Sequence, residues 1–206
     1  MNLATAISDG ALAACAFAGA ITLERTRRSS RPGQSQALMS AAVGLALIGL
    51  AAAIGCLRYG VAPGLIELHI LLTNVAGHFA MPMIGAGYVA IAWSLGPSRN
   101  GWLALFIALG LLPSVSAIAG LYGVYTLLIG SVGVLGILAA AAQRRRAQPS
   151  ASVVAGGGAL LVLIAGLVIG TEGDLGPIAR IDAFHYTLAL AALLKASGLR
   201  SFADAT

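Results

Sequence analysis

The sequence predicts an all-α polytopic membrane protein, a bundle of seven transmembrane helices that forms one domain over residues 1–206. Of the 206 residues, 59% are hydrophobic and only 9% are charged, which is far too apolar for a soluble domain of this size. The charged residues gather in short patches, and the apolar runs between them are long enough to cross a bilayer. The chain lacks the ten-residue alternating segments of a membrane β-barrel, so helices are the predicted elements.

The first three helices are expected at about residues 4–23, 37–57 and 67–93. An arginine-rich loop separates the first two, and Pro32 with Gly33 marks a break in it. The loop before the third helix contains Pro63 and Gly64. Within the third helix, Pro82 predicts a kink.

The remaining four helices are expected at about residues 102–119, 122–142, 151–170 and 178–194. Residues 102–142 form one apolar run of two crossings, with the turn expected near Gly120 and Pro113–Ser114 as the alternative position. Three consecutive glycines, residues 156–158, predict close helix packing. The last helix is expected to end beside Lys195, whose amine then reaches the membrane surface.

Basic residues are distributed unequally between the loops on the two sides of this arrangement. One side carries ten of them: Arg25, Arg27, Arg28, Arg31, Arg99, Arg144, Arg145, Arg146, Lys195 and Arg200. The other side carries Arg58 and Arg180. Because basic loops stay in the cytoplasm, the chain is predicted to lie in a bacterial inner (plasma) membrane with its amino terminus outside and its carboxyl terminus cytoplasmic. The expected partners are membrane lipids and other membrane subunits, and no nucleic acid, since no basic patch is interleaved with aromatic residues.

A polar stripe runs along the third helix. At about 100° per residue, Glu67, Asn74 and His78 fall at roughly 0°, 340° and 20°, on one face. His69 lies on a different face and is expected at the membrane interface. Because polar groups in lipid are costly, the stripe is predicted to face other helices or a water-filled cavity.

The predicted orientation places most acids and all three histidines in the outer half of the membrane, where they suggest a metal site. Asp182 and His185 are spaced i, i+3 and share a helix face. With His78 they would supply imidazole and carboxylate ligands for Zn²⁺ and leave a position open for water. Glu67 and Asp9 are the candidate catalytic residues, because a carboxylate that does not bind the metal can act as a general base on that water.

Simpler roles are open for each of these residues. His78 is equally compatible with a bond to a helix carbonyl or to Asn74, and His185 with a pair to Asp182. The rim arginines Arg58 and Arg180 are alternative partners for the acids. Cys15 and Cys56 lie in apolar segments and are expected to be small packing residues.

The segment Ile181–His185, an Asp-x-x-His in the last helix, resembles the superfamily of alkaline ceramidases and progestin/adiponectin-type receptors. Seven helices, an outside amino terminus and an acid in the first helix, Asp9, belong to the same resemblance. The segment and the opening Thr5–Asp9 are also similar to small uncharacterised bacterial seven-helix proteins. The ceramidase-type resemblance implies zinc-dependent hydrolysis of amide or related bonds in lipids, although Ala189 stands where that pattern has a second histidine.

The leading function predicted from the sequence is therefore a membrane-embedded, metal-assisted lipid hydrolase with an outward-facing polar pocket. The main alternative is a non-catalytic subunit or scaffold of a larger membrane complex, which the 27 glycines favour because they allow close helix packing. A haem or quinone protein that uses His78 and His185 is a third possibility. A membrane terpenoid cyclase with Glu67 or Asp182 as its acid is a fourth, which the aromatic content of 6% disfavours.

Overall fold

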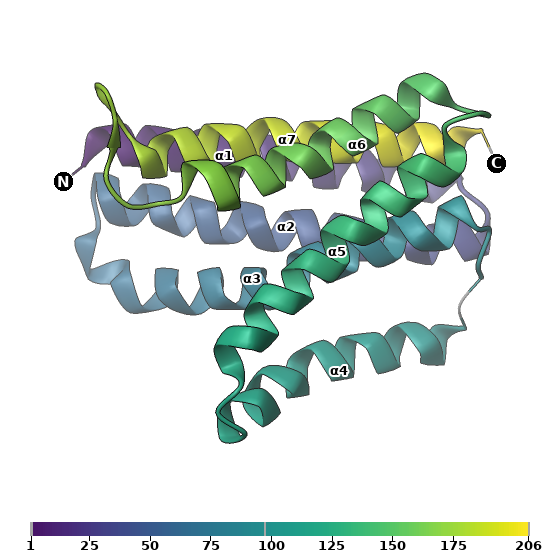
Figure 1. Ribbon diagram of the computed structural model, residues 1–206, viewed down its shortest axis with the longest axis horizontal. Helices are drawn as coiled ribbons and strands as arrows, with labels where there is room; N and C mark the ends of the chain where they lie inside the picture. The colour runs from purple at the N-terminus through teal and green to yellow at the C-terminus, as the bar shows by residue number, and fades with distance from the viewer. Residues whose placement is uncertain (1, 97, 206) are drawn as a thin grey trace.

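The computed structural model describes residues 2–96 and 98–205, which fold into a bundle of helices that run back and forth between two ends (Figure 1). The α-helices are α1 (Leu3–Ser29), α2 (Pro32–Gly60), α3 (Ile66–Ala92), α4 (Arg99–Ile118), α5 (Tyr122–Arg144), α6 (Pro149–Leu163) and α7 (Arg180–Asp204). A 3₁₀ turn, η1 (Pro63–Leu65), precedes α3, and a π-helical segment, η2 (Ile164–Ile169), extends α6. Two short antiparallel strands, β1 (Asp174–Leu175) and β2 (Ile178–Ala179), lead into α7.

Six of the described helices are long and apolar enough to cross a membrane: α1 to α5, and α6 together with η2. The seventh, α7, is not among them because charged side chains interrupt its apolar sequence. It nevertheless runs beside α1 along the length of the bundle (Figure 1). The predicted all-α polytopic bundle is therefore confirmed, whereas the seventh crossing stays a prediction.

Several helices are longer than the sequence predicts. α1 continues to Ser29, and Glu24 pairs there with Arg27 and Arg28 at i, i+3 and i, i+4 spacing. α7 continues to Asp204 instead of ending near residue 194. Lys195 consequently lies inside α7 and is only 2% exposed, so the prediction that its amine reaches the membrane surface is wrong.

Glycines set the close contacts between helices. α5 crosses α3 at Gly133, where a Cβ would collide with the backbone of Met81, and at Gly85, where a Cβ would collide with Gly133. Gly158 lies against Leu194 and Lys195 of α7, as expected of the glycine run, while Gly157 faces open space. Small residues in this way bring helix backbones together without a large interlocking core.

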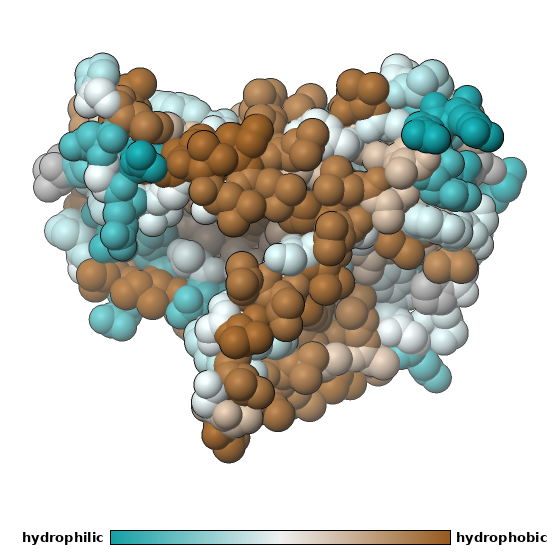
Figure 2. Space-filling view, viewed as in Figure 1, coloured by the Kyte–Doolittle hydropathy of each residue, from teal (hydrophilic) through white to brown (hydrophobic). Residues whose placement is uncertain are grey.

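The helix α4 is the least attached part of the bundle. Only Trp102 and Leu109 of α4 are buried, and in Figure 1 its far end diverges from the first half of α3. Its exposed apolar side chains continue the hydrophobic band in Figure 2, which lies between hydrophilic ends of the molecule. An apolar band flanked by polar ends is the surface expected of a membrane-embedded bundle.

Candidate functional site

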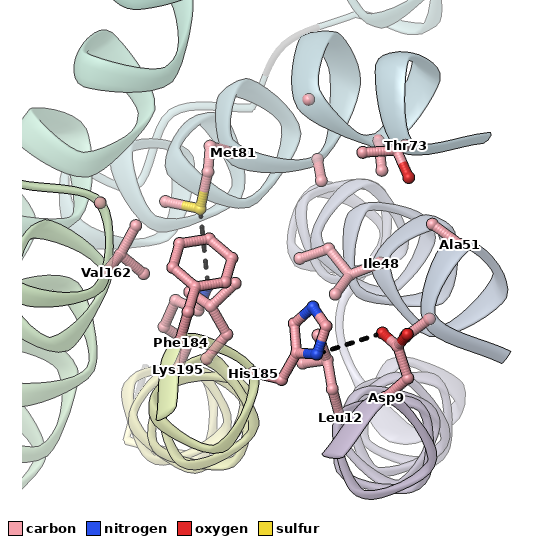
Figure 3. Close-up of a pocket in the computed structure, with 16 residues that line it drawn as sticks. Asp9, Leu12, Ile48, Ala51, Thr73, Met81, Val162, Phe184, His185 and Lys195 are labelled. Atoms are coloured by element: carbon pink, nitrogen blue, oxygen red, sulfur yellow. Dashed lines mark hydrogen bonds and ion pairs between the residues drawn. The ribbon is translucent and has the colours of Figure 1, made fainter. Parts of the chain in front are cut away.

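A cavity of about 310 Å³ lies between α1, α2, α3, α7 and the stretch formed by α6 and η2 (Figure 3). Its floor is formed by buried residues such as Leu12, Ala52 and Ala80, whereas Thr73, Gly77 and Gly166 on its rim are exposed. These rim residues lie along the sides of α3 and η2, within helices long and apolar enough to span a membrane. The cavity therefore opens sideways, and Figure 2 shows the hollow on this face.

One end of the cavity holds Asp9 of α1 and His185 of α7. The Nδ1 atom of His185 lies 3.5 Å from the Oδ1 atom of Asp9 and 3.1 Å from the hydroxyl of Ser8. That hydroxyl donates to Asp182 Oδ1 over 2.9 Å. Asp9, Asp182 and His185 are all buried, so α1 and α7 are joined here by a polar network inside the bundle.

The hydrogen-bond partners of His185 favour one tautomer of its ring. The Ser8 hydroxyl has two acceptors, Asp182 Oδ1 and the Thr5 carbonyl oxygen, and with its proton given to either one, the tautomer that suits the network carries the His185 proton on Nδ1, toward Ser8 and Asp9. A neutral imidazole then carries a lone pair on Nε2. Figure 3 shows this second nitrogen pointing away from Asp9 into the cavity. A carboxylate that orients a histidine in this way prepares its free nitrogen to accept a proton.

A second histidine approaches Asp9 from the opposite side through a gap at Gly55 of α2. A Cβ on Gly55 would lie 2.9 Å from His69 Nε2 and would collide with Asp9 Oδ2. Arg58 donates to His69 Nδ1 over 2.8 Å, so the neutral His69 ring carries its proton on Nε2, the side of Asp9. The Asp9 carboxylate thus lies between two imidazoles, and Gly55 is required because any side chain would fill this space.

The other end of the cavity holds Lys195, ten residues further along α7. Its Nζ atom lies 3.5 Å from the sulfur of Met81, as the second dashed line in Figure 3 marks. Apolar and small residues line the cavity between the two ends, among them Ile48, Ala76 and Leu188. The site is therefore a mostly apolar chamber with a polar group at each end.

Of the candidate residues from the sequence, Asp9, Asp182 and His185 come together, and His78 and Glu67 do not join them. The His78 ring packs against Tyr122 and Tyr125 of α5, with ring centroids 5.4 and 5.6 Å away. The prediction that the whole α3 stripe faces the bundle interior holds for His78, which is buried, and is wrong for Glu67 and Asn74, which are exposed. The reason is that α4 diverges from α3 and leaves this face of the first half of α3 uncovered (Figure 1).

The sequence offered Arg58 and Arg180 as alternative partners for the acids, and the structure gives both arginines other partners. Arg180 donates to the carbonyl oxygens of Val168 and Ile169 at the end of η2 instead of pairing with Asp182. Arg58 stacks over Tyr59 and bonds His69. Both arginines therefore bind neighbouring groups at the end of the bundle. Within the described residues, neither forms an ion pair with the buried acids.

The side chains present do not fit the three-histidine zinc site that the ceramidase-type resemblance implies. His185 lies beside both Asp9 and Asp182, whereas His69 reaches only the Asp9 side and is bonded by Arg58, and His78 packs against the α5 tyrosines. Within residues 2–96 and 98–205, no three His, Cys, Asp or Glu side chains are grouped as metal ligands. Zn²⁺ at this site stays a prediction that the placement of the ligands does not favour.

Sequence reasoning missed Ser8, Gly55 and Lys195. Ser8 and Gly55 carry no signal in one sequence, because a serine and a glycine in an apolar helix are ordinary packing residues. Lys195 did carry a signal: it is the sole lysine in the chain, and every other basic residue is an arginine. Its burial could not be read from the sequence without the true end of α7.

Comparison of the chain with family models, with curated proteins and with solved structures finds no match.

Proposed function

We propose that this integral membrane protein binds a neutral, lipid-soluble amphiphile in the lateral cavity and exchanges a proton with its polar group through His185. The observation that carries the proposal is the orientation of His185, whose Nδ1 is held by Ser8 and Asp9 while its Nε2 faces the cavity. A ligand reaching this nitrogen from the bilayer would not have to cross water, because the rim at Gly77 and Gly166 is on the side of the bundle.

The lining supports an apolar ligand with one polar end. Apart from Asp9, Thr73, His185 and Lys195, the cavity is lined by aliphatic residues, small residues, Met81 and Phe184. Apolar walls with a few placed polar groups are typical of sites that bind and orient small molecules. A hydroxyl or carbonyl oxygen at the Asp9 end would find a hydrogen-bonding partner there, and the apolar part would fill the remaining space.

We assign the cavity to the outer half of a bacterial inner membrane and count α7 as a seventh crossing. Nine arginines lie at the end of the bundle where α1, α3, α5 and α7 finish, and Arg58 and Arg180 lie at the other end. This asymmetry supports a cytoplasmic carboxyl terminus. It changes the predicted ten-to-two ratio to nine-to-two, since Lys195 is buried inside the bundle.

Lipid hydrolysis is a second candidate, favoured by the same Asp9–His185 pair. A histidine oriented by a carboxylate can take a proton from water as the water attacks an ester or amide. This version of the predicted hydrolase needs no metal. Turnover of a fluorogenic lipid ester that is lost in His185→Gln would separate hydrolysis from binding alone.

The binding proposal is tested by photolabelling in liposomes with a long-chain alcohol that carries a diazirine. Peptide mapping should find label on α3 and α7 residues that line the cavity, such as Met81 and Phe184. In Gly77→Leu the new side chain enters the cavity from its rim, where a Cβ meets no atom within 4 Å, so this labelling should be lost while the fold is kept.

The matched control is Gly123→Leu on α5, another open helical glycine that does not line the cavity. It should leave labelling at Met81 and Phe184 unchanged. Labelling spread evenly over the lipid-facing surface, and equal in both leucine variants, would contradict a specific cavity site.

A further inference from the structure

Lys195 is a buried amine without a counter-charge. It is 2% exposed, and its Nζ contacts the Met81 sulfur, which is only a weak acceptor. Within the described residues, no carboxylate forms an ion pair with it. An isolated ammonium group is costly in such surroundings, whereas a neutral amine is tolerated and is a nucleophile.

The surroundings of Lys195 are built to hold this side chain. Gly158 of α6 leaves room for its stem, because a Cβ there would lie 3.1 Å from Lys195 Cγ. The hydroxyl of Tyr88, which is fully buried, donates to the Lys195 carbonyl oxygen over 2.6 Å and fixes the backbone. The amine is consequently held at the cavity by two neighbouring helices.

We infer that Lys195 forms a reversible Schiff base with a lipid-soluble aldehyde that enters the cavity from the bilayer. This inference rests on the proposed function, since it names the class of molecule that the cavity binds. The Nζ lone pair attacks the aldehyde carbon. The two amine protons pass to the former carbonyl oxygen, the C–O bond breaks, and that oxygen leaves as water while the C=N bond forms. Amine and aldehyde are thereby converted to imine and water, with no oxidant or reductant.

A neutral carbonyl compound fits this site better than a fatty-acid carboxylate. A carboxylate would bring its charge through apolar surroundings to reach Lys195, at a cost of several kcal/mol on membrane scales. An aldehyde crosses the same region uncharged, and its imine leaves no charge in the apolar site.

The distance between the two polar ends of the cavity limits the length of the ligand. Lys195 and His185 are ten residues apart on α7, which corresponds to about 15 Å along the helix axis. An extended aldehyde bound to Lys195 would therefore point its far end toward His185. A polar group at that far end is the one that the proposed acid–base function would act on.

The test treats the full-length protein in liposomes with decanal at neutral pH, followed by sodium borohydride, which reduces an imine to a stable secondary amine. Peptide mass spectrometry should locate a decyl adduct on Lys195. Lys195→Met should lack it, and Gly77→Leu, which fills the cavity, should lose most of it. The chain simplifies the assay because Lys195 is its sole lysine.

Arg200→Lys provides the matched control, because it adds an exposed lysine on the same helix without removing Lys195. Lys195 should carry at least about tenfold more adduct than the added lysine, since an exposed amine is almost fully protonated at neutral pH. Adduct on the added lysine but not on Lys195 would overturn the Schiff base. If cavity photolabelling persists in that case, the proposed function stands, and if photolabelling also fails, both are wrong.

Discussion

Asp9 is buried near histidines from two other helices, His185 of α7 and His69 of α3. One of its oxygens faces His185, and the other is buried near His69 and the gap at Gly55. Each histidine is fixed in turn, His185 by Ser8 and His69 by Arg58. Hydrogen bonds therefore orient both imidazoles near Asp9, while Asp9 Oδ2, on the His69 side, has no hydrogen-bond partner within the described residues.

Ser8→Ala tests how much the bundle depends on this network. The substitution removes the hydroxyl bond to Asp182 and leaves a buried carboxylate oxygen without that donor, so we expect a loss of about 1–3 kcal/mol in stability. Thermal unfolding in detergent should show a clearly lower Tm. Ser131→Ala is the matched control, because the exposed Ser131 hydroxyl bonds only to Leu127 of its own helix. Equal Tm values for the two variants would mean that the network is not structural.

At the scale of the elements, α3 has two different surroundings along its length. Its second half packs closely against α2 and α5 through Gly85, Gly87 and the backbone beside Pro82, while its first half leaves Glu67 and Asn74 exposed. The lateral cavity lies beside this first half, at Thr73 and Gly77. The cavity exists because α5 crosses α3 at an angle and does not cover its first half (Figure 1).

Gly133→Leu should disturb this crossing. A side chain at Gly133 collides with the backbone of Met81 and Pro82, which cannot move aside as a flexible side chain would. Overpacking of this kind costs about 1–3 kcal/mol or more. Gly130→Leu, one turn earlier on α5, meets open space and is the control. A Tm for Gly133→Leu that matches the control would show that the α3–α5 contact is looser than described.

The same elements show what the sequence can predict. Apolar run lengths and loop charges are local properties, so they indicate helix number and approximate bounds. Helix ends depend on local pairs such as Glu24 with Arg27, which lengthened α1 beyond residue 23. The meeting of Asp9 with His185, and the separation of His185 from His78, depend on which helices pack together, and a single sequence does not encode that in its periodicity.

The whole molecule presents an apolar band between two polar ends of unequal charge (Figure 2). With nine arginines at one end, the positive-inside rule predicts that this end faces the cytoplasm. In this predicted orientation the Asp9–His185 end of the cavity lies toward the outside, and Lys195 lies deeper in the membrane.

Cysteine labelling tests this orientation. In a variant whose native cysteines, Cys15 and Cys56, are replaced by serine, single cysteines at Ser29 and Ser98 should resist a membrane-impermeant maleimide in intact cells. A cysteine at Glu172, in the exposed loop before α7, should react. The reverse pattern would invert the topology, and equal labelling at all three positions would exclude a fixed membrane orientation.

¹⁵N NMR of the three histidine side chains in nanodiscs, assigned with His69 and His78 variants, tests ligand binding at His185 most directly. We expect that His185 carries its proton on Nδ1 and that dodecanol shifts the His185 Nε2 signal, with little change at His78. In Gly77→Leu, the shift at His185 should disappear. A His185 protonated on Nε2, or a His185 signal that does not respond to saturating dodecanol, would contradict a cavity ligand at this histidine.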